Sequence, residues 1–349
     1  MTLHRTLTRT FSALTLATAT LTVHSTGQAQ QTHWPAKPVT WIVPFAAGGP
    51  TDAMARDIAD RTGKQLGQTI LIENVPGAGG TIGSTKAARS APDGYTFLVG
   101  HMGYMAAAPA LYKKLSYDPV KDFEAVFRFP DTPMVLMVSA QSPFKDAAAL
   151  VAHAKAHPGQ LNFSNAGVGS ASHLVAALFA SKAGIRITSV AYKGAGPALN
   201  DLMGGQVDAM FDQTNTALPQ LGPRVRAVGL TSRETSPQFP GVPALGAQVV
   251  PGFEAATWYG LYAPKGTPAN IVSALHQAYL KALQDKEWTQ RMAAQGIRLL
   301  DTAAYAPAAL KQHTADEGVR WQKVIADAGI TLESVSYTHL RAHETSLHL

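Results

Sequence analysis

The sequence predicts an α/β protein of two domains, each with a mixed, mostly parallel sheet flanked by helices. Apolar runs of strand length alternate with segments of helical spacing along most of the chain. The 349 residues, 46% of them hydrophobic, are enough for two domains rather than one. Glycine-rich junctions separate several of these strands from the helices that follow, as expected for βα units.

The first part of the chain reads as strand, helix, strand, helix, strand. The run "VTWIVPF" at 39–45 predicts a strand, and 51–67 predicts a helix with a glycine stop. A strand at 68–77, a helix at 81–92 and a strand at 95–101 follow. This βαβ order predicts parallel neighbours with helices on both faces of the sheet.

The pattern resumes after residue 133. Its expected members are, in order, strand 134–140, helix 144–159, strand 161–167, helix 170–184, strand 189–194, helix 196–205, strand 206–212 and strand 224–232. The Pro/Gly-rich stretch 236–254 predicts a long surface connection. A strand at 256–264 and helical segments at 267–296 and 305–329 end the pattern.

The two ends of the chain do not fit this pattern. Residues 1–29 carry Arg5 and Arg9, then a short apolar run and small residues, which indicates a signal peptide cut near Ala29 and a soluble, exported protein. The segment 335–349, "VSYTHLRAHETSLHL", resembles read-through of a synthetic adapter. We expect it to be non-native.

Composition excludes several classes of function. The absence of cysteine excludes disulfides, thiolate nucleophiles and cysteine-bound metals. The formal net charge of +6 is scattered rather than clustered, so nucleic acid is not an expected partner. His153 and His157 lie one helical turn apart without a third ligand, which favours a solvated helix face over a metal site. No metal or cofactor is expected.

The stretch "PFAAGGPTD" joins the first strand to the first helix and predicts an anion site. Gly49 is the expected N-cap, Pro50 suits the first helical turn, and Asp52 can bond back to the cap as in a capping box. Gly48 and Gly49 carry no Cβ, so a ligand can approach the N–H groups of the helix start. A tight turn that needs glycine only for its dihedral angles is the alternative.

Three further glycine-rich junctions repeat this plan. They lie at Gly77–Gly80, at Gly167–Ser170 and at Lys193–Pro197. Loops at the carboxyl ends of strands face a common crevice in open α/β sheets. The four junctions therefore predict a cleft, lined by main-chain donors from both halves, that binds a small anion.

Other interpretations of these residues fit less well. The run 77–83 departs from a dinucleotide fingerprint because its last glycine falls one position late, and His101 stands where the ribose-binding acid is expected. Ser170 and His173 could serve an exported hydrolase, but no carboxylate partner is identifiable. Asp212 could contact a ligand amine or a water, or cap the next helix.

Six stretches between residues 34 and 330 form a recognisable set. They are, in order, "WPAKPVTWIVPFAAGGPTDAMAR", "ENVPGAGGTIGSTKAARSAPDGYTFL", "YDPVKDFEAVF", "LNFSNAGVGSASHL", "AYKGAGPALNDLMGGQVDAMF" and "WYGLYAPKGTP". In this order they resemble the solute-binding receptors of tripartite tricarboxylate transporters, the Bug-type proteins. The resemblance covers residues 34–330 and implies a periplasmic, type II-like, Venus-flytrap binding protein of two lobes. One lobe would comprise 34–132 and 256–330 and the other 133–255, with a hinge near Pro133 and Thr257.

The resemblance also implies a function without catalysis. A monomeric receptor would close on a small organic carboxylate (a di- or tricarboxylate, an aromatic acid or an amino acid) and deliver it to membrane transporter subunits. The implied ligand-binding residues come from both lobes and are Phe45, Gly48, Gly49, Asp52, Gly77, Ala78, Gly79, Gly80, Ser170, Lys193, Gly194 and Asp212.

Overall fold

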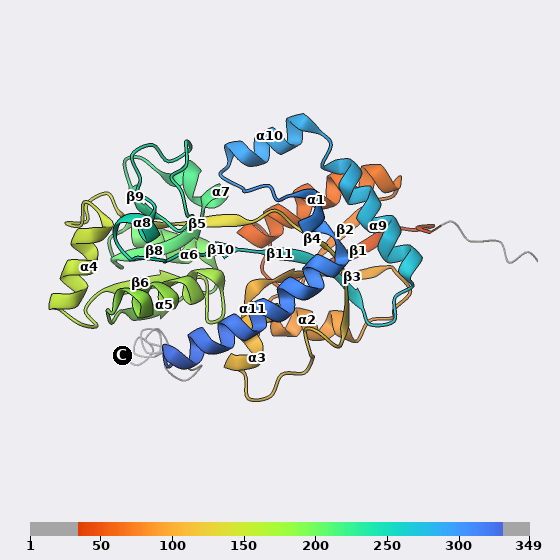
Figure 1. The fold of residues 1–349 in the computed structure, drawn as a ribbon, viewed down its shortest axis with the longest axis horizontal. Coiled ribbons are helices and arrows are strands. Elements are labelled where there is room, and N and C mark those ends of the chain that lie inside the picture. The colour runs from red at the N-terminus through yellow and green to blue at the C-terminus, as the bar shows by residue number, and fades with distance from the viewer. Residues whose placement is uncertain (1–33, 331–349) are drawn as a thin grey trace, which may run out of the picture. The chain divides into compact units, whose positions relative to one another are not determined.

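The computed structural model describes residues 34–330, which form two β-sheets covered by helices (Figure 1). The expected signal peptide, 1–29, and the expected non-native tail, 335–349, lie outside the described residues. The α/β class predicted from the alternating pattern is confirmed, with strands and helices in the expected order.

The first sheet has five strands in the order β2-β1-β3-β11-β4. Strands β1, β2 and β3 are parallel neighbours, while β11 is antiparallel to both β3 and β4. Their bounds are β1 Val39–Val43, β2 Ile70–Asn74, β3 Thr96–His101, β4 Phe123–Arg128 and β11 Tyr259–Pro264.

Helices cover both faces of this sheet (Figure 1). One face packs against α1 (Pro50–Leu66), α9 (Ala269–Ala282) and α10 (Lys286–Ala294) around the buried Trp41 and Phe127. The other face packs against α2, α3 and the long α11. These three span Thr81–Ala88, Ala108–Leu111 and Pro307–Asp327.

The second sheet has six strands, in the order β10-β5-β8-β6-β7 with β9 beside β5. Its strands are β5 Thr132–Ser139, β6 Asn162–Asn165, β7 Thr188–Ala191, β8 Ala209–Gln213, β9 Val225–Leu230 and β10 Ala256–Thr257. Apolar clusters tie α4, α5 and α8 to one face and α6 and α7 to the other. These helices span Ala147–Ala156, Ala171–Ala183, Leu245–Gln248, Ala195–Met203 and Thr214–Ala217.

Each sheet contains one strand that runs against the others, and in each case the chain has just arrived from the other sheet. Strand β5 follows β4 of the first sheet and is antiparallel to β8, β9 and β10. Strand β11 follows β10 of the second sheet and is antiparallel to β3 and β4. The mostly parallel character predicted for each sheet is therefore confirmed, and both exceptions lie at the crossings.

Several elements differ from the sequence-based expectation. The predicted helical segment 267–296 is two helices, because Asp285 caps α10 by accepting a hydrogen bond from the N–H of Trp288 at 3.1 Å. Strand β4 and a π-helical turn at Gly103–Ala107 were not predicted. Short 3₁₀ turns occur at Ala78–Gly80, Leu218–Gln220 and Thr302–Tyr305.

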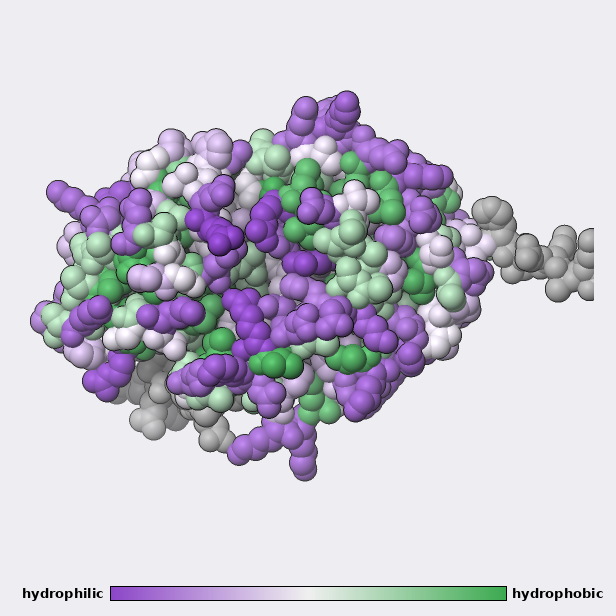
Figure 2. Space-filling model, in the orientation of Figure 1, coloured by the Kyte–Doolittle hydropathy of each residue, from purple (hydrophilic) through white to green (hydrophobic). Residues whose placement is uncertain are grey.

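The surface is largely hydrophilic on the face drawn in Figure 2, where hydrophobic residues form small separate groups. The large apolar side chains that are exposed are dispersed over several elements, and include Leu71, Ile82 and Val319. Within 34–330, no helix has both the length and the apolar character needed to cross a bilayer.

Candidate functional site

The loop between β1 and α1 is held by the carboxylate of Asp52. Gly49 is the N-cap of α1 and Pro50 its first residue, as predicted. The capping-box pattern predicts that Asp52 accepts a hydrogen bond from the N–H of Gly49. It accepts one instead from the N–H of the preceding residue, Gly48, at 2.9 Å. Its two oxygens also accept bonds from Asn74 and Arg56, both at 2.9 Å.

These bonds keep Asp52 ionised although it is buried. Burial alone would raise the pKa of this carboxyl group, but hydrogen bonds from Arg56, Gly48 and Asn74 outweigh it and lower the pKa. In the first turn of α1, Pro50 has no N–H and Ala53 donates to the main-chain oxygen of Gly49, which leaves the N–H groups of Thr51 and Asp52 without an acceptor in the helix. The loop thus presents main-chain donors at the positive end of a 17-residue helix.

The second glycine loop, Gly77–Gly80, is a turn built from positive φ angles. The φ values of Gly77, Gly79 and Gly80 are 133°, 63° and 97°, which glycine adopts readily, and Ala78, at 45°, is the only non-glycine residue within 34–330 with a positive φ. A Cβ on Gly79 would lie 2.7 Å from the main-chain oxygen of Val168, and one on Gly80 would lie 2.3 Å from the ring of Tyr104. The missing side chains therefore allow close packing on both sides of this turn.

The third loop leads into α5, whose N-cap is Ser170. The Ser170 hydroxyl accepts a hydrogen bond from the N–H of His173 and lies 3.1 Å from the hydroxyl of Ser172. His173 Nδ1 accepts from the N–H of Gly169 at 3.3 Å, and burial lowers the pKa of His173 to about 4. In the described structure, Ser170 and His173 therefore do not form the nucleophile–base hydrogen bond that a hydrolase needs.

The fourth loop precedes α6 and lies against the third. Gly194 is the N-cap of α6 with a φ of 122°, and Lys193 is exposed. A Cβ on Gly167 would lie 3.2 Å from the main-chain oxygen of Tyr192. The loops that follow β6 and β7 are thus in contact at the carboxyl ends of two parallel neighbours.

Contacts across the two sheets bring all four loops together. Phe45, half-buried in the β1–α1 loop, packs against Tyr104 with 5.9 Å between ring centroids. Tyr104 in turn lies beside Gly80, and the turn formed by Gly77–Gly80 touches Val168. The hydroxyl of Tyr259 on β11 donates to Gln213 Oε1 on β8 at 2.8 Å, which joins the sheets at their adjacent ends.

Asp212, at the end of β8, is buried beside this junction. Its Oδ2 accepts a hydrogen bond from the hydroxyl of Thr216 at 3.0 Å, and the N-cap of α7 is Gln213 rather than Asp212. Burial raises the pKa of Asp212 to about 6, against the opposing hydrogen bonds from Gln213 and Thr216. Burial thus favours the protonated form of this carboxyl group.

The sequence analysis missed several residues that join these loops. They are Gly103, which contacts Gly169, together with Tyr104 and Gln213. Tyr104 carried the weak signal that it follows strand β3, whereas nothing local marked Gln213.

Buried cations do not contribute to the described part of the site. No lysine or arginine within 34–330 is buried. The same residues contain no cluster of three His, Cys, Asp or Glu side chains placed to hold a metal ion. His153 and His157 pack against each other with 4.6 Å between ring centroids.

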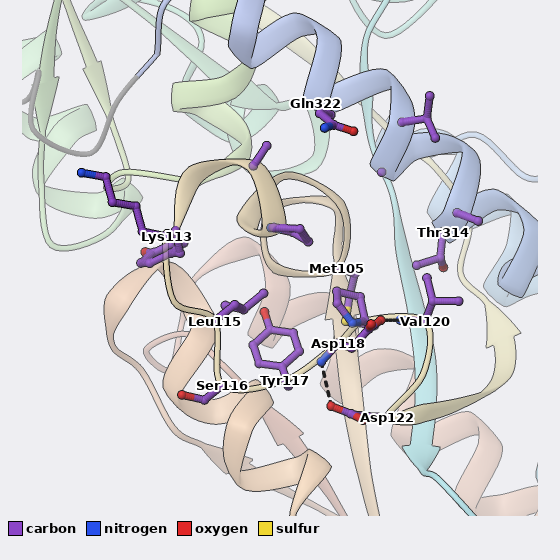
Figure 3. Close-up of a pocket in the computed structure, with 17 residues that line it drawn as sticks. Met105, Lys113, Leu115, Ser116, Tyr117, Asp118, Val120, Asp122, Thr314 and Gln322 are labelled. Atoms are coloured by element: carbon purple, nitrogen blue, oxygen red, sulfur yellow. Dashed lines mark hydrogen bonds between the residues drawn. The ribbon is translucent and has the colours of Figure 1, made fainter.

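A cavity of about 840 Å³ lies elsewhere, between α11 and the chain that follows α3. Figure 3 shows Thr314 and Gln322 on α11 on one side and Leu115 and Tyr117 on the other. It contains none of the residues of the four loops. Tyr112 links its wall to the second glycine loop, because its hydroxyl donates to the main-chain oxygen of Ala78 at 2.8 Å.

Comparison with known proteins identifies the family. The profile of the family described as "Tripartite tricarboxylate transporter family receptor" matches residues 54–330. MatC from Rhodopseudomonas palustris, solved with bound malate, is 40% identical, with a TM-score of 0.79 over 84% of this chain and 100% of that one. The periplasmic binding protein BugD is 38% identical, with a TM-score of 0.79 over 85% of this chain and 99% of BugD.

A second R. palustris protein, solved with adipate, is 34% identical, with a TM-score of 0.79 over 86% of this chain and 100% of that one. The similarity thus extends over nearly the whole described structure. The chain belongs to the tripartite tricarboxylate transporter receptor family, among its Bug-type solute-binding proteins.

Proposed function

We propose that this protein encloses a small organic carboxylate between its two lobes and delivers it to the membrane subunits of a tripartite transporter. The observation that carries the proposal is the convergence of four glycine-rich loops from both sheets at one place. Main-chain N–H groups and a helix dipole are suited to a carboxylate. Relatives solved with malate and adipate support this ligand class.

Such a site can reach the binding affinity that a receptor requires. A micromolar dissociation constant corresponds to about −8 kcal/mol. Hydrogen bonds to a charged group contribute about 1.5–3 kcal/mol each, so four or five of them supply this after the cost of ordering. No activated nucleophile is required, and nothing in the geometry of Ser170 and His173 favours the hydrolase alternative.

The proposed ligand-binding residues divide into those that contact the ligand and those that hold the loops. Asp52 is assigned to the second group, because its carboxylate is occupied by Gly48, Asn74 and Arg56. Asp212, buried at the junction, is assigned to the ligand side. The same assignment is proposed for Phe45, Gly48, Gly49, Gly77, Ala78, Gly79, Gly80, Ser170, Lys193 and Gly194.

The proposed lobes are 34–132 with 256–330, and 133–255. Two crossing segments support this division: Thr132 on β5 pairs with Thr257 on β10, and Phe129 donates its N–H to the main-chain oxygen of Tyr259 at 3.0 Å. Paired strands at a crossing are suited to a hinge, because a small twist there moves both lobes. Export to the periplasm, as the description of BugD suggests, belongs to the same proposal.

A ligand screen tests the function. The mature protein is titrated by calorimetry, and melted by thermal shift, with malate, adipate, citrate, aromatic acids and amino acids, and with a neutral sugar and divalent cations as controls. We expect saturable binding and a raised melting temperature for at least one acid, since a ligand that binds only the folded state stabilises it. Binding of the sugar or a cation, with no response to any acid, would refute the proposal.

A further inference from the structure

His101 lies at the end of β3, where the two sheets approach each other. Its ring packs between Phe45 and Tyr259, with centroid distances of 5.5 and 5.3 Å. Gly103, whose N–H bonds to the His101 ring, is also the residue that meets Gly169 of the second sheet. His101 therefore borders the junction of the four loops, although it is not among the residues that the glycine pattern indicates.

The hydrogen bond to Gly103 fixes which ring nitrogen carries the proton. His101 Nδ1 accepts the N–H of Gly103 at 2.9 Å, so Nδ1 is unprotonated. Burial lowers the pKa of His101 to about 3, so the imidazole is neutral at physiological pH. In this tautomer the proton is on Nε2, and the side chain is an uncharged N–H donor.

This donor has no protein acceptor. Within 34–330, no hydrogen bond joins His101 Nε2 to a protein atom, although only 2% of the residue is exposed. His101 Nε2 is not among the fully buried polar atoms that lack a partner, which include Nε2 of His276 and of His313, so it keeps contact with solvent. A donor that has no protein partner at the junction of the four loops is open to a ligand oxygen or a water.

We infer that His101 is a ligand-contacting residue that determines specificity, donating its Nε2–H to an oxygen atom of the enclosed acid. The inference rests on the proposed function and deepens it. Because no lysine or arginine is buried near the site, the buried contacts to the acid come from uncharged donors, of which His101 is one, while Lys193 is exposed. An N–H donor at this position favours a carboxylate, carbonyl or hydroxyl oxygen next to it and disfavours an ammonium group.

Three substitutions separate contact with the ligand from support of Gly103. In His101→Asn the amide oxygen takes the place of Nδ1 and keeps the Gly103 bond, but the donor to the ligand is lost. In His101→Gln the amide nitrogen takes the place of Nε2 and keeps the donor. His101→Phe removes both. His276→Asn, on α9 and away from the junction, is the matched control.

Malate and adipate are the probes, each titrated by calorimetry into the wild type and the four variants. For the tighter of the two, we expect about 10- to 100-fold weaker binding by His101→Asn and His101→Phe, the loss typical of one hydrogen bond to a charged group. We expect His101→Gln to recover most of that loss, and His276→Asn to bind like the wild type.

Two outcomes overturn the inference while leaving the proposed function intact. One is wild-type affinity in His101→Phe. The other is wild-type affinity in His101→Asn with weak binding by His101→Gln, which would mean that His101 acts only by supporting Gly103. If instead the wild type binds neither probe nor any other acid of the wider panel, the proposed function itself fails. Melting curves without ligand establish that each variant is folded.

Discussion

Gly103 and Gly169 meet across the two sheets so closely that a Cβ on Gly103 would lie 2.2 Å from the main-chain oxygen of Gly169. A real Cβ cannot occupy that distance, and a main-chain oxygen cannot rotate aside as a side chain can. Gly79 meets Val168 in the same way at 2.7 Å. The segment Val168–Gly169 is thus flanked by two glycines of the first sheet, and the contact depends on their missing side chains.

Gly103→Ala is expected to block this contact and weaken ligand binding at least about 10-fold. Gly103 does not have a positive φ, so alanine suits its backbone, and the cost of the substitution falls on the contacts with the main-chain oxygen of Gly169 and, at 3.1 Å, with His101 Nδ1. The ligand-induced rise in melting temperature should shrink, because the closed form is the one that holds the acid. Thermal shift and small-angle scattering, with and without ligand, measure both effects.

Gly318→Ala is the matched control for this substitution. Gly318 lies in α11, without a positive φ, and has open space where a Cβ would stand. We expect it to bind ligand like the wild type. If the ligand compacts Gly103→Ala and raises its melting temperature as much as it does for the wild type, the contact is not required for closure.

Asp52→Ala is expected to lower the free energy of unfolding by about 1–3 kcal/mol, because it leaves the donors of Gly48 and Asn74 without their acceptor. Loosening of the β1–α1 loop should also weaken ligand binding. Asp60→Ala, on the same helix but in an exposed pair with Lys64, should change stability by less than about 0.5 kcal/mol. Urea unfolding of both variants checks this, and equal effects would contradict it.

The glycine loops could be predicted because their signals are local. Each follows an apolar run directly, and the N-cap Gly49 and the first helical residue, Pro50, are adjacent in the sequence. The contacts that join the loops could not be predicted, because residues such as Tyr259 and Gln213 are 46 positions apart and meet only when β11 and β8 are in place. The four glycine junctions predicted a cleft and the family resemblance implied two lobes, but neither indicated the contacts that join the loops.

Strand β4 shows another limit of sequence analysis. Phe123–Arg128 pairs only with β11 at the edge of its sheet, and half of its residues are incompletely buried. Its hydrophobic pattern is correspondingly weak. By contrast, the break between α9 and α10 had a readable signal, since Asp285 is an N-cap residue within an otherwise helical pattern.

Asp212→Asn is expected to change how stability depends on pH. The pKa of Asp212 is raised to about 6 in the folded protein from a usual value of 3.8. The protonated carboxyl group of Asp212 therefore makes its full contribution to the free energy of unfolding below pH 3.8, and this contribution is lost as pH rises through about 6. Relative to the wild type, the variant should gain about 2–3 kcal/mol in unfolding free energy between pH 4 and pH 7.

Urea unfolding of the wild type and Asp212→Asn at several pH values measures this gain. The comparison of the two proteins cancels the other groups that titrate in the same range. A difference that stays constant from pH 4 to pH 7 would mean that the buried carboxyl group does not carry the raised pKa.

Glu317→Gln is expected to destabilise the crossing between β10 and β11. Trp258, which lies between these strands, donates to Glu317 Oε2 at 2.9 Å, and Trp321 donates to the same oxygen at 3.1 Å. An amide cannot accept both bonds and also the bond from Arg320 to Oε1, so we expect a loss of about 2–3 kcal/mol. Glu287→Gln, in an exposed pair with Arg291 on α10, should cost less than about 0.5 kcal/mol.

The loss in Glu317→Gln should also depend on pH in the sense opposite to that of Asp212. Burial would raise the pKa of Glu317, but Arg320 and the hydrogen bond from Trp258 outweigh it, and the pKa falls below its usual 4.5. The stability that its charge supplies is present above pH 4.5 and disappears as pH falls through the lowered pKa. Unfolding curves of the two proteins should therefore converge on acidification, and curves that diverge there would mean that the carboxylate is not what holds α11 to the crossing.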